Sequence, residues 1–185
     1  MKRLVLIVGA LVVVLLAGAV FWRYKTKSHS PENAIEFNDG NLQITVSYNR
    51  PYKKGRIIFG GLVPYGKTWR TGANEATVIE TNQDLYLKGQ KLARGRYSVW
   101  TVPNEGQWQV IFNTVIPPWG IDVMNDGQAA RDPEGTEIIV TVPVMASPKE
   151  IEQFTITIEK VNDSLEMVFL WDRTLVSVPI SLSAQ

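Results

Sequence analysis

The sequence predicts an all-β protein: an antiparallel β-sandwich of about eight to ten strands, preceded by one N-terminal transmembrane helix. Three observations support this prediction. An uncharged apolar run occupies Leu4–Trp22. Beyond residue 40, apolar and polar residues alternate with a period of two in most segments, as in half-buried strands. Turn-forming Gly, Pro, Asn and Asp residues recur at intervals of about ten residues, which leaves room for strands and little room for helices.

Residues 1–27 are expected to form a membrane anchor. As a helix, Leu4–Trp22 would be about 28 Å long, close to the ~30 Å hydrocarbon thickness of a bilayer. Ala19 ends a small-residue pattern typical of signal-peptide cleavage sites, but the apolar run continues beyond it. We therefore expect an uncleaved signal-anchor, with cleavage after Ala19 as the alternative. Residues suited to the membrane interface follow the run: Trp22, Arg23, Tyr24, Lys25 and Lys27.

The orientation of the anchor does not follow from its charges, because basic residues flank the apolar run on both sides. The N-terminal end is short and signal-like, so we expect the C-terminal part to be translocated to the extracytoplasmic side. The chain has no cysteine, and its domain therefore depends on a hydrophobic core and not on disulfides.

Residues 28–40 are polar and are expected to form a tether, followed by the β-sandwich domain at residues 41–185. A hairpin is expected around Gly89 and Gly95, which tolerate positive φ. One helical turn is expected near Pro148–Gln153. Residues 165–171 are apolar on both faces except at Glu166, which suits a central strand. Six other segments alternate as half-buried strands: residues 42–48, 96–102, 108–113, 138–142, 154–158 and 176–180.

Charge is divided unevenly along the chain. Residues 40–104 carry ten basic and three acidic side chains, whereas residues 105–185 carry four basic and twelve acidic ones. From Gly40 to Asn74 there is no acid. The part beyond the anchor is acidic as a whole, which argues against nucleic-acid binding, while its first half favours contact with an anionic partner.

Two stretches carry a resemblance to a known family. They are "SYNRPYKKGRIIFGGLVPYGKTWRTGANEATVIE", from Ser47 to Glu80, and "LKGQKLARGRYSVWTVPNEGQWQVIFN", from Leu87 to Asn113. Together they resemble the bacterial family known as domain of unknown function 2911. The resemblance implies a strand-rich, exported or membrane-attached domain, here at the bacterial inner membrane with the domain in the periplasm. It implies no activity or cofactor. Residues 113–135 depart most from the family pattern.

The motif at residues 67–80 is the best candidate for a ligand site. Arginines fork two donors toward carboxylates or phosphates and stay charged at any ordinary pH. A tryptophan beside them would form an apolar or stacking wall. An amide and a carboxylate would accept hydrogen bonds from donors on the ligand. The expected ligand-binding residues are Arg50, Arg56, Trp69, Arg70, Asn74 and Glu75. The alternative is internal: Glu75 pairs with Arg70 or Arg56, and Trp69 closes the end of the sandwich.

The other tryptophans divide by their phase in the strands. Trp108 and Trp171 fall in phase with apolar neighbours and are expected in the core. Trp100 lies on the strand face opposite Tyr97 and Val99, and Trp119 follows two prolines in a loop. Of these four tryptophans, only Trp100 and Trp119 are therefore placed so that they could stack on a ligand, and the alternative is that they are ordinary exposed aromatics.

Metal and catalytic motifs are weak. The acidic loop that holds Asp122, Asn125, Asp126, Asp132 and Glu134 fits no calcium-loop spacing. Zinc lacks ligands, because there is no cysteine and His29 is the one histidine. A cysteine nucleophile is likewise absent, and we expect no Ser–His–Asp triad because His29 lies in the expected tether, outside the domain. We expect no metal and no cofactor.

The sequence thus favours a membrane-anchored binding or scaffolding domain. It would contact an anionic envelope ligand or a protein partner through its basic first half. Two alternatives stay open. One is a hydrolase of envelope polymers with Glu75 as acid or base, which would need a second carboxylate about 5–10 Å away. The other is a purely structural protein.

Overall fold

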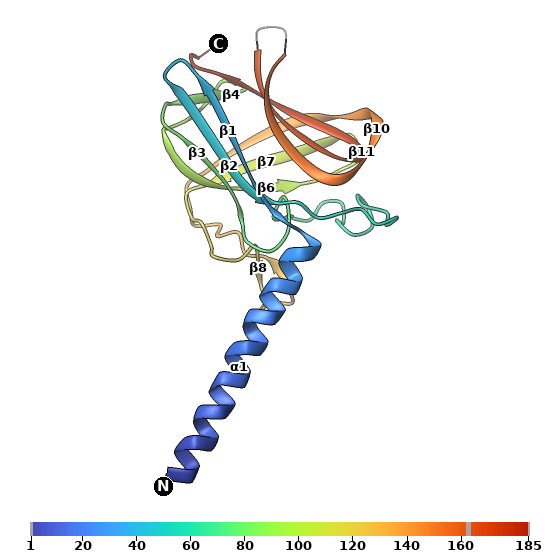
Figure 1. Cartoon of the computed structure of the whole chain (residues 1–185). Coiled ribbons are helices and arrows are strands. Elements are labelled where there is room, and N and C mark those ends of the chain that lie inside the picture. Colours follow the sequence, from blue (N-terminus) through green and yellow to red (C-terminus); the bar gives the residue numbers. More distant parts are fainter. Residues whose placement is uncertain (1, 162–163, 185) are drawn as a thin grey trace.

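The computed structural model describes residues 2–161 and 164–184, which form one long helix and an antiparallel β-domain (Figure 1). The predicted fold class is confirmed. The helix is α1 (Lys2–His29). The strands are β1 (Glu32–Asp39), β2 (Leu42–Asn49), β3 (Thr77–Thr81), β4 (Leu85–Leu87), β5 (Gln90–Leu92), β6 (Gly95–Val102), β7 (Gln107–Asn113), β8 (Ile121–Asp122), β9 (Gln128–Ala129), β10 (Glu137–Val161) and β11 (Ser164–Ser181).

Helix α1 projects away from the β-domain (Figure 1), and its side chains from Ile7 to Phe21 are exposed. Its segment Ile7–His29 contains an 18-residue window with a mean hydropathy of 2.1 and is long enough to cross a membrane. A core helix of a soluble protein would be buried, so this helix has the character of a membrane anchor or a signal sequence. The side chains of Trp22, Arg23 and Tyr24, expected at the membrane interface, lie outside the described part of the structure.

The predicted tether at residues 28–40 is instead mostly strand. Two residues, Ser30 and Pro31, separate the end of α1 from β1. Strand β1 pairs with β2 along its whole length, and Ile35 and Phe37 pack against the core. These two side chains are half-buried because β1 is an edge strand. Because the strand has so few apolar positions, its alternation in the sequence is weak. Helix and domain are therefore joined without a flexible linker.

Nine strands form one sheet in the order β1-β2-β3-β6-β7-β10-β11-β4-β5. The long strand β10 folds this sheet into two layers, because its two halves have different neighbours. Its first half, Glu137–Pro143, pairs with β7, and its second half, from Val144 onward, pairs with β11. The register shifts between Ala146 and Thr155, in the segment expected to contain a helical turn, so that expectation is wrong: the segment is an irregular stretch of strand.

The two layers also meet along a seam that follows β2. The backbone N–H of Phe154 donates to Pro51 O at 2.9 Å, and that of Lys53 donates to Glu152 O at 2.6 Å. The Tyr48 hydroxyl accepts from the Ile156 N–H at 3.0 Å. Between the layers lies the main hydrophobic core, in which Trp108 and Trp171 are fully buried, as expected.

A second, smaller apolar cluster lies on the outer face of β6 and β7. Trp100 is fully buried there with Ala76 and Ile111, and Ala129 and Ala130 pack against it. The expectation that Trp100 is exposed is therefore wrong. The alternation correctly placed it opposite Val99, but it carried no information about the β7–β10 loop (residues 114–136) that covers this face.

The predicted hairpin at Gly89 is confirmed. β4 pairs with β5 across Lys88 and Gly89, both at positive φ (47° and 81°). Two central residues with positive φ define the tight turn whose twist suits antiparallel strands.

Candidate functional site

A cleft of about 1130 Å³ opens at the end of the β-domain from which α1 emerges. Three segments supply its walls: the end of α1 with Ser30, residues 51–73, and residues 121–133 of the β7–β10 loop. Trp69 and Trp171 provide its aromatic lining. Segments far apart in the sequence therefore build one concave site.

The loop at residues 69–75 is held in an uncommon backbone conformation. Thr71 and Asn74 have φ of 54° and 57°, which is costly for residues with a Cβ and especially for β-branched threonine. The surroundings enforce this conformation. The N–H of Trp69 donates to Thr101 O at 2.7 Å, the N–H of Thr101 donates back to Trp69 O at 3.0 Å, and the Thr77 hydroxyl donates to Thr71 O at 2.7 Å. The loop is therefore a rigid support for Trp69 and Arg70.

Arg70 lines the cleft and has no compensating partner among the described residues. Its Nε is buried and finds no hydrogen-bond acceptor, and no carboxylate of the described residues lies within ion-pair distance of its guanidinium. Burial lowers the pKa of Arg70 below its usual value, because desolvation disfavours the charged form. An unsatisfied buried donor costs roughly 1–3 kcal/mol, and more when it is charged. An anion in the cleft would remove this cost.

Gly120 makes room for Arg70. A Cβ at this position would lie 2.6 Å from Arg70 Cδ and 2.9 Å from Arg70 Cβ. The backbone of Gly120 also joins two walls of the cleft, since its N–H donates to Asn74 O at 2.8 Å and its carbonyl accepts from Ala130 N–H at 3.2 Å. The arginine stem is thus confined between the 69–75 loop and the β7–β10 loop.

The cleft is strongly cationic. Arg56 lines it and donates from its guanidinium to the carbonyls of Tyr52 and Lys53, which leaves three of its five donors. Arg131 is already neutralised, because its guanidinium pairs with Glu137 at 3.1 Å. The charged side chains that line the cleft are Lys54, Arg56, Lys67, Arg70, Arg131 and, as the one carboxylate among the described lining residues, Asp126.

The other three candidate residues are bonded inside the fold. The guanidinium of Arg50 donates to Phe154 O at 3.1 Å and to the Thr155 hydroxyl at 2.8 Å, and so it ties β2 to β10. The amide of Asn74 is buried and donates to Ser30 O at 3.4 Å. Arg50, Asn74 and Glu75 are absent from the described lining of the cleft.

Glu75 connects the domain to the helix. Its carboxylate lies 3.2 Å from the Lys27 ammonium and accepts from the Asn49 amide at 3.1 Å. Burial by itself would raise the pKa of Glu75. Its own backbone N–H, Lys27 and Asn49 outweigh that effect and lower the pKa. Glu75 is therefore an ionised structural link between α1 and the 69–75 loop.

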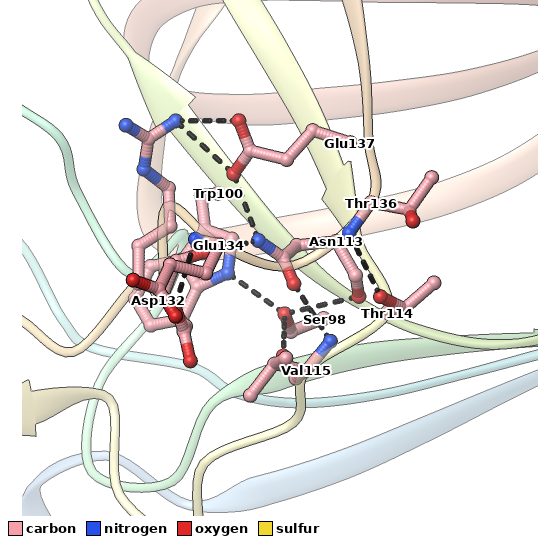
Figure 2. A network of polar contacts seen from close by, with 10 residues as sticks. Ser98, Trp100, Asn113, Thr114, Val115, Asp132, Glu134, Thr136 and Glu137 are labelled. Atoms are coloured by element: carbon pink, nitrogen blue, oxygen red, sulfur yellow. Dashed lines mark hydrogen bonds and ion pairs between the residues drawn. The ribbon is translucent and has the colours of Figure 1, made fainter.

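A buried polar network holds the β7–β10 loop against the sheet, and Figure 2 shows Asn113 at its centre. The Asn113 amide donates to Asp132 O at 2.6 Å and to Glu137 Oε1 at 2.8 Å, and its oxygen accepts from Val115 N–H at 2.6 Å. Beside it, Trp100 Nε1 donates to the Ser98 hydroxyl at 2.8 Å. This network fixes the loop that forms one wall of the cleft.

Two acidic side chains of the β7–β10 loop accept hydrogen bonds from the backbone of the loop itself. The carboxylate of Asp122 accepts from Met124 N–H at 2.9 Å, and that of Asp132 accepts from Glu134 N–H at 2.8 Å. Within the described residues, no group of three or more histidine or acidic side chains is placed to hold a metal ion. Trp119 is half-buried and is not part of the described cleft lining.

A family model described as "Protein of unknown function (DUF2911)" matches residues 30–180. The chain belongs to the DUF2911 family. The match starts just after α1 and takes in β1, so the DUF2911 domain includes the strand that was expected to be part of a tether. No curated protein and no solved structure gives a significant match to the chain.

In this DUF2911 domain, three of the six candidate residues, Arg56, Trp69 and Arg70, line one cleft. Lys67 was missed, although this lysine belongs to the same motif as Trp69 and Arg70, and so were Gly120 and Asn113. No sequence signal marked Gly120, because its contact with Arg70 joins segments fifty residues apart.

Proposed function

We propose that this protein is a single-pass, membrane-anchored binding module that holds an anionic ligand in the cleft beside Trp69. In this proposal α1 stays in the chain as an anchor in the bacterial inner membrane, and the domain faces the periplasm. Arg70 forms the main charge contact, Arg56 and Lys67 add to it, and Trp69 forms the apolar wall.

The observation that carries the proposal is the buried Nε of the half-buried Arg70, which has no hydrogen-bond acceptor among the described residues. A buried donor of a charged group that lacks an acceptor is costly. Here the same fold pairs other cations, such as Arg131 with Glu137 and Lys53 with Asp172 at 2.7 Å. The exception lies in the cationic cleft, where a phosphate or carboxylate group of a ligand would supply the missing acceptor.

The hydrolase alternative receives no support from the geometry. Glu75 is engaged by Lys27 and Asn49, and Asp126 is the one carboxylate among the described residues that line the cleft. Acid–base hydrolysis by two carboxylates needs both of them across an open cleft. The purely structural alternative accounts for Arg50 and Asn74, but it gives no reason for Arg70.

Thermal unfolding of the full chain in detergent, with inorganic pyrophosphate or phosphate as the probe, tests the proposal. The wild type should be stabilised by the probe, by about 2.7 kcal/mol at a concentration 100-fold above Kd. Arg70→Met should lose this stabilisation. Arg96→Met is the matched control, because Arg96 lies on the sheet surface, where it pairs with Glu80, and this variant should keep the full response.

Equal stabilisation of the wild type and Arg70→Met would refute the proposed role of Arg70. Absence of stabilisation by both anions in the wild type would refute phosphate-like anions as the ligand class.

A further inference from the structure

We propose that the hairpin formed by β8 and β9 is a second membrane contact, with Val123 and Met124 inserted into the headgroup layer of the bilayer that α1 crosses. This inference rests on one part of the proposed function, the retention of α1 as an anchor. It does not depend on ligand binding in the cleft.

The tip of this hairpin exposes apolar side chains on an ordered turn. Val123 is 75% exposed and Met124 is 95% exposed. The turn is closed by backbone bonds from Gly127 N–H to Asp122 O at 3.0 Å and from Gln128 N–H to Asn125 O at 3.0 Å. Two adjacent apolar side chains are thus held out toward the surroundings, and burial of such side chains in an apolar environment is favourable.

The hairpin lies at the end of the domain from which the helix emerges. In Figure 1, β8 is level with the last turns of α1, on the side facing the helix N-terminus. The contacts agree with this view, because His29 and Ser30 line the same cleft as Ile121 and Gly127. The hairpin therefore extends in the direction in which the apolar part of α1 lies.

The height of the domain above the bilayer follows from the helix. The apolar run ends at Trp22 and α1 ends at His29, a rise of about 10 Å. The headgroup layer on each side of a bilayer is roughly 5–8 Å thick. Because Ser30 and Pro31 alone separate α1 from β1, the linker is too short for the domain to move away from the bilayer surface. A hairpin that extends from it toward the helix N-terminus consequently reaches the headgroups.

The contact is apolar and not electrostatic. Residues 121–129 contain two acids and no basic residue, and one of these acids, Asp122, accepts a bond from Met124 N–H. Anionic lipid would not attract this segment. Insertion should therefore occur in bilayers of zwitterionic phosphatidylcholine, which separates it from any attraction of the basic cleft to anionic lipids.

The absence of native cysteine makes a direct test possible. Met124→Cys in the full chain is labelled with an environment-sensitive fluorophore and reconstituted in phosphatidylcholine nanodiscs, with and without lipids that carry a quencher on the upper acyl chain. Leu182→Cys is the matched control: Leu182 is also apolar and exposed, and it lies near the C-terminus at the far end of the domain (Figure 1). Intact mass before reconstitution confirms that α1 is retained.

We expect several-fold stronger quenching at position 124 than at position 182, and a reduced effect at 124 when Val123→Asp is added. Equal quenching at both positions, or none at 124, would overturn the proposal. Loss of α1 in the mass measurement would refute the anchor and this contact together. Quenching at 124 in a chain that pyrophosphate does not stabilise would support the hairpin contact while rejecting the anion site.

Discussion

Trp69 lies stacked against Trp171, with ring centroids 5.8 Å apart and ring planes inclined by 17°. Trp171 is fully buried in the core, whereas Trp69 is half-buried and faces the cleft. The pair therefore connects the cleft directly to the interior, and this geometry allows the two tryptophans to be distinguished by mutation.

Trp171→Ala should destabilise the protein by about 3–5 kcal/mol, as expected for a fully buried aromatic side chain. Trp69→Ala should cost clearly less, because part of its surface is already in water. Denaturant unfolding of the full chain in detergent measures both. Equal losses of unfolding free energy in the two variants would show that Trp69 acts mainly as a core residue. Its role as the apolar wall of a ligand site would then need other support.

Arg50 and Arg70 should respond in opposite ways to the same substitution. Arg50→Met should destabilise the free protein by roughly 1–3 kcal/mol, because it removes two bonds to β10 and leaves Phe154 O short of a donor. Arg70→Met should leave stability unchanged or raise it, since a buried unpaired donor is removed. Comparable destabilisation by both would mean that Arg70 has an internal structural role.

Gly120→Ala should destabilise the protein by roughly 1–3 kcal/mol and weaken its response to pyrophosphate, because the new Cβ would displace Arg70. Gly106→Ala is the matched control, since a Cβ there meets nothing within 4 Å. Thermal unfolding with and without pyrophosphate measures both effects. A Gly120→Ala chain that behaves like Gly106→Ala would show that Arg70 is free to move aside.

Glu75 should contribute to the pH dependence of stability. Its pKa is lower in the folded protein than the ordinary value of 4.5, so its contribution is present above that pH and is lost as pH falls through the folded pKa. Glu75→Gln should cost about 1 kcal/mol near neutral pH, given its partly exposed pair with Lys27. The free energies of unfolding of the wild type and Glu75→Gln, measured between pH 3 and 7, should converge as the pH falls. A difference that stays constant with pH would contradict the assignment of Glu75 as an ionised link.

Asn113→Ala should loosen the β7–β10 loop. It removes three hydrogen bonds and leaves buried groups unsatisfied, at a cost of about 2 kcal/mol or more. Hydrogen exchange over residues 115–136 should become faster, while exchange in β2 stays slow. Asn38→Ala, at an exposed position, is the control. Unchanged exchange in the loop would show that other contacts hold it.

The sequence predicted the parts of the fold that repeat locally. Leu42–Tyr48 alternates cleanly, and this strand is found as β2 with the expected inward face. Strand β1 escaped prediction because an edge strand with two apolar side chains gives a weak signal. The passage of β10 from one layer to the other was not predicted, because the sequence alternation of a strand does not mark the point where its pairing partner changes from β7 to β11.

The site was predicted in the same partial way. Trp69 and Arg70 are adjacent in the chain, so their joint presence in the cleft follows from local sequence. Gly120 approaches Arg70 from a loop fifty residues away, and only the folded chain shows that contact. Residue type likewise did not reveal which arginines find internal acceptors, because the acceptors of Arg50 lie more than a hundred residues along the chain.

If α1 is retained as the proposed anchor, the short joint between α1 and β1 makes the anchor and the domain one mechanical unit in a membrane. Transmembrane helices tilt to match the local hydrocarbon thickness. With two residues at the junction and an ion pair from Lys27 to Glu75 across it, a change in tilt would rotate the domain as well. Bilayer thickness would then set the direction in which the cleft faces.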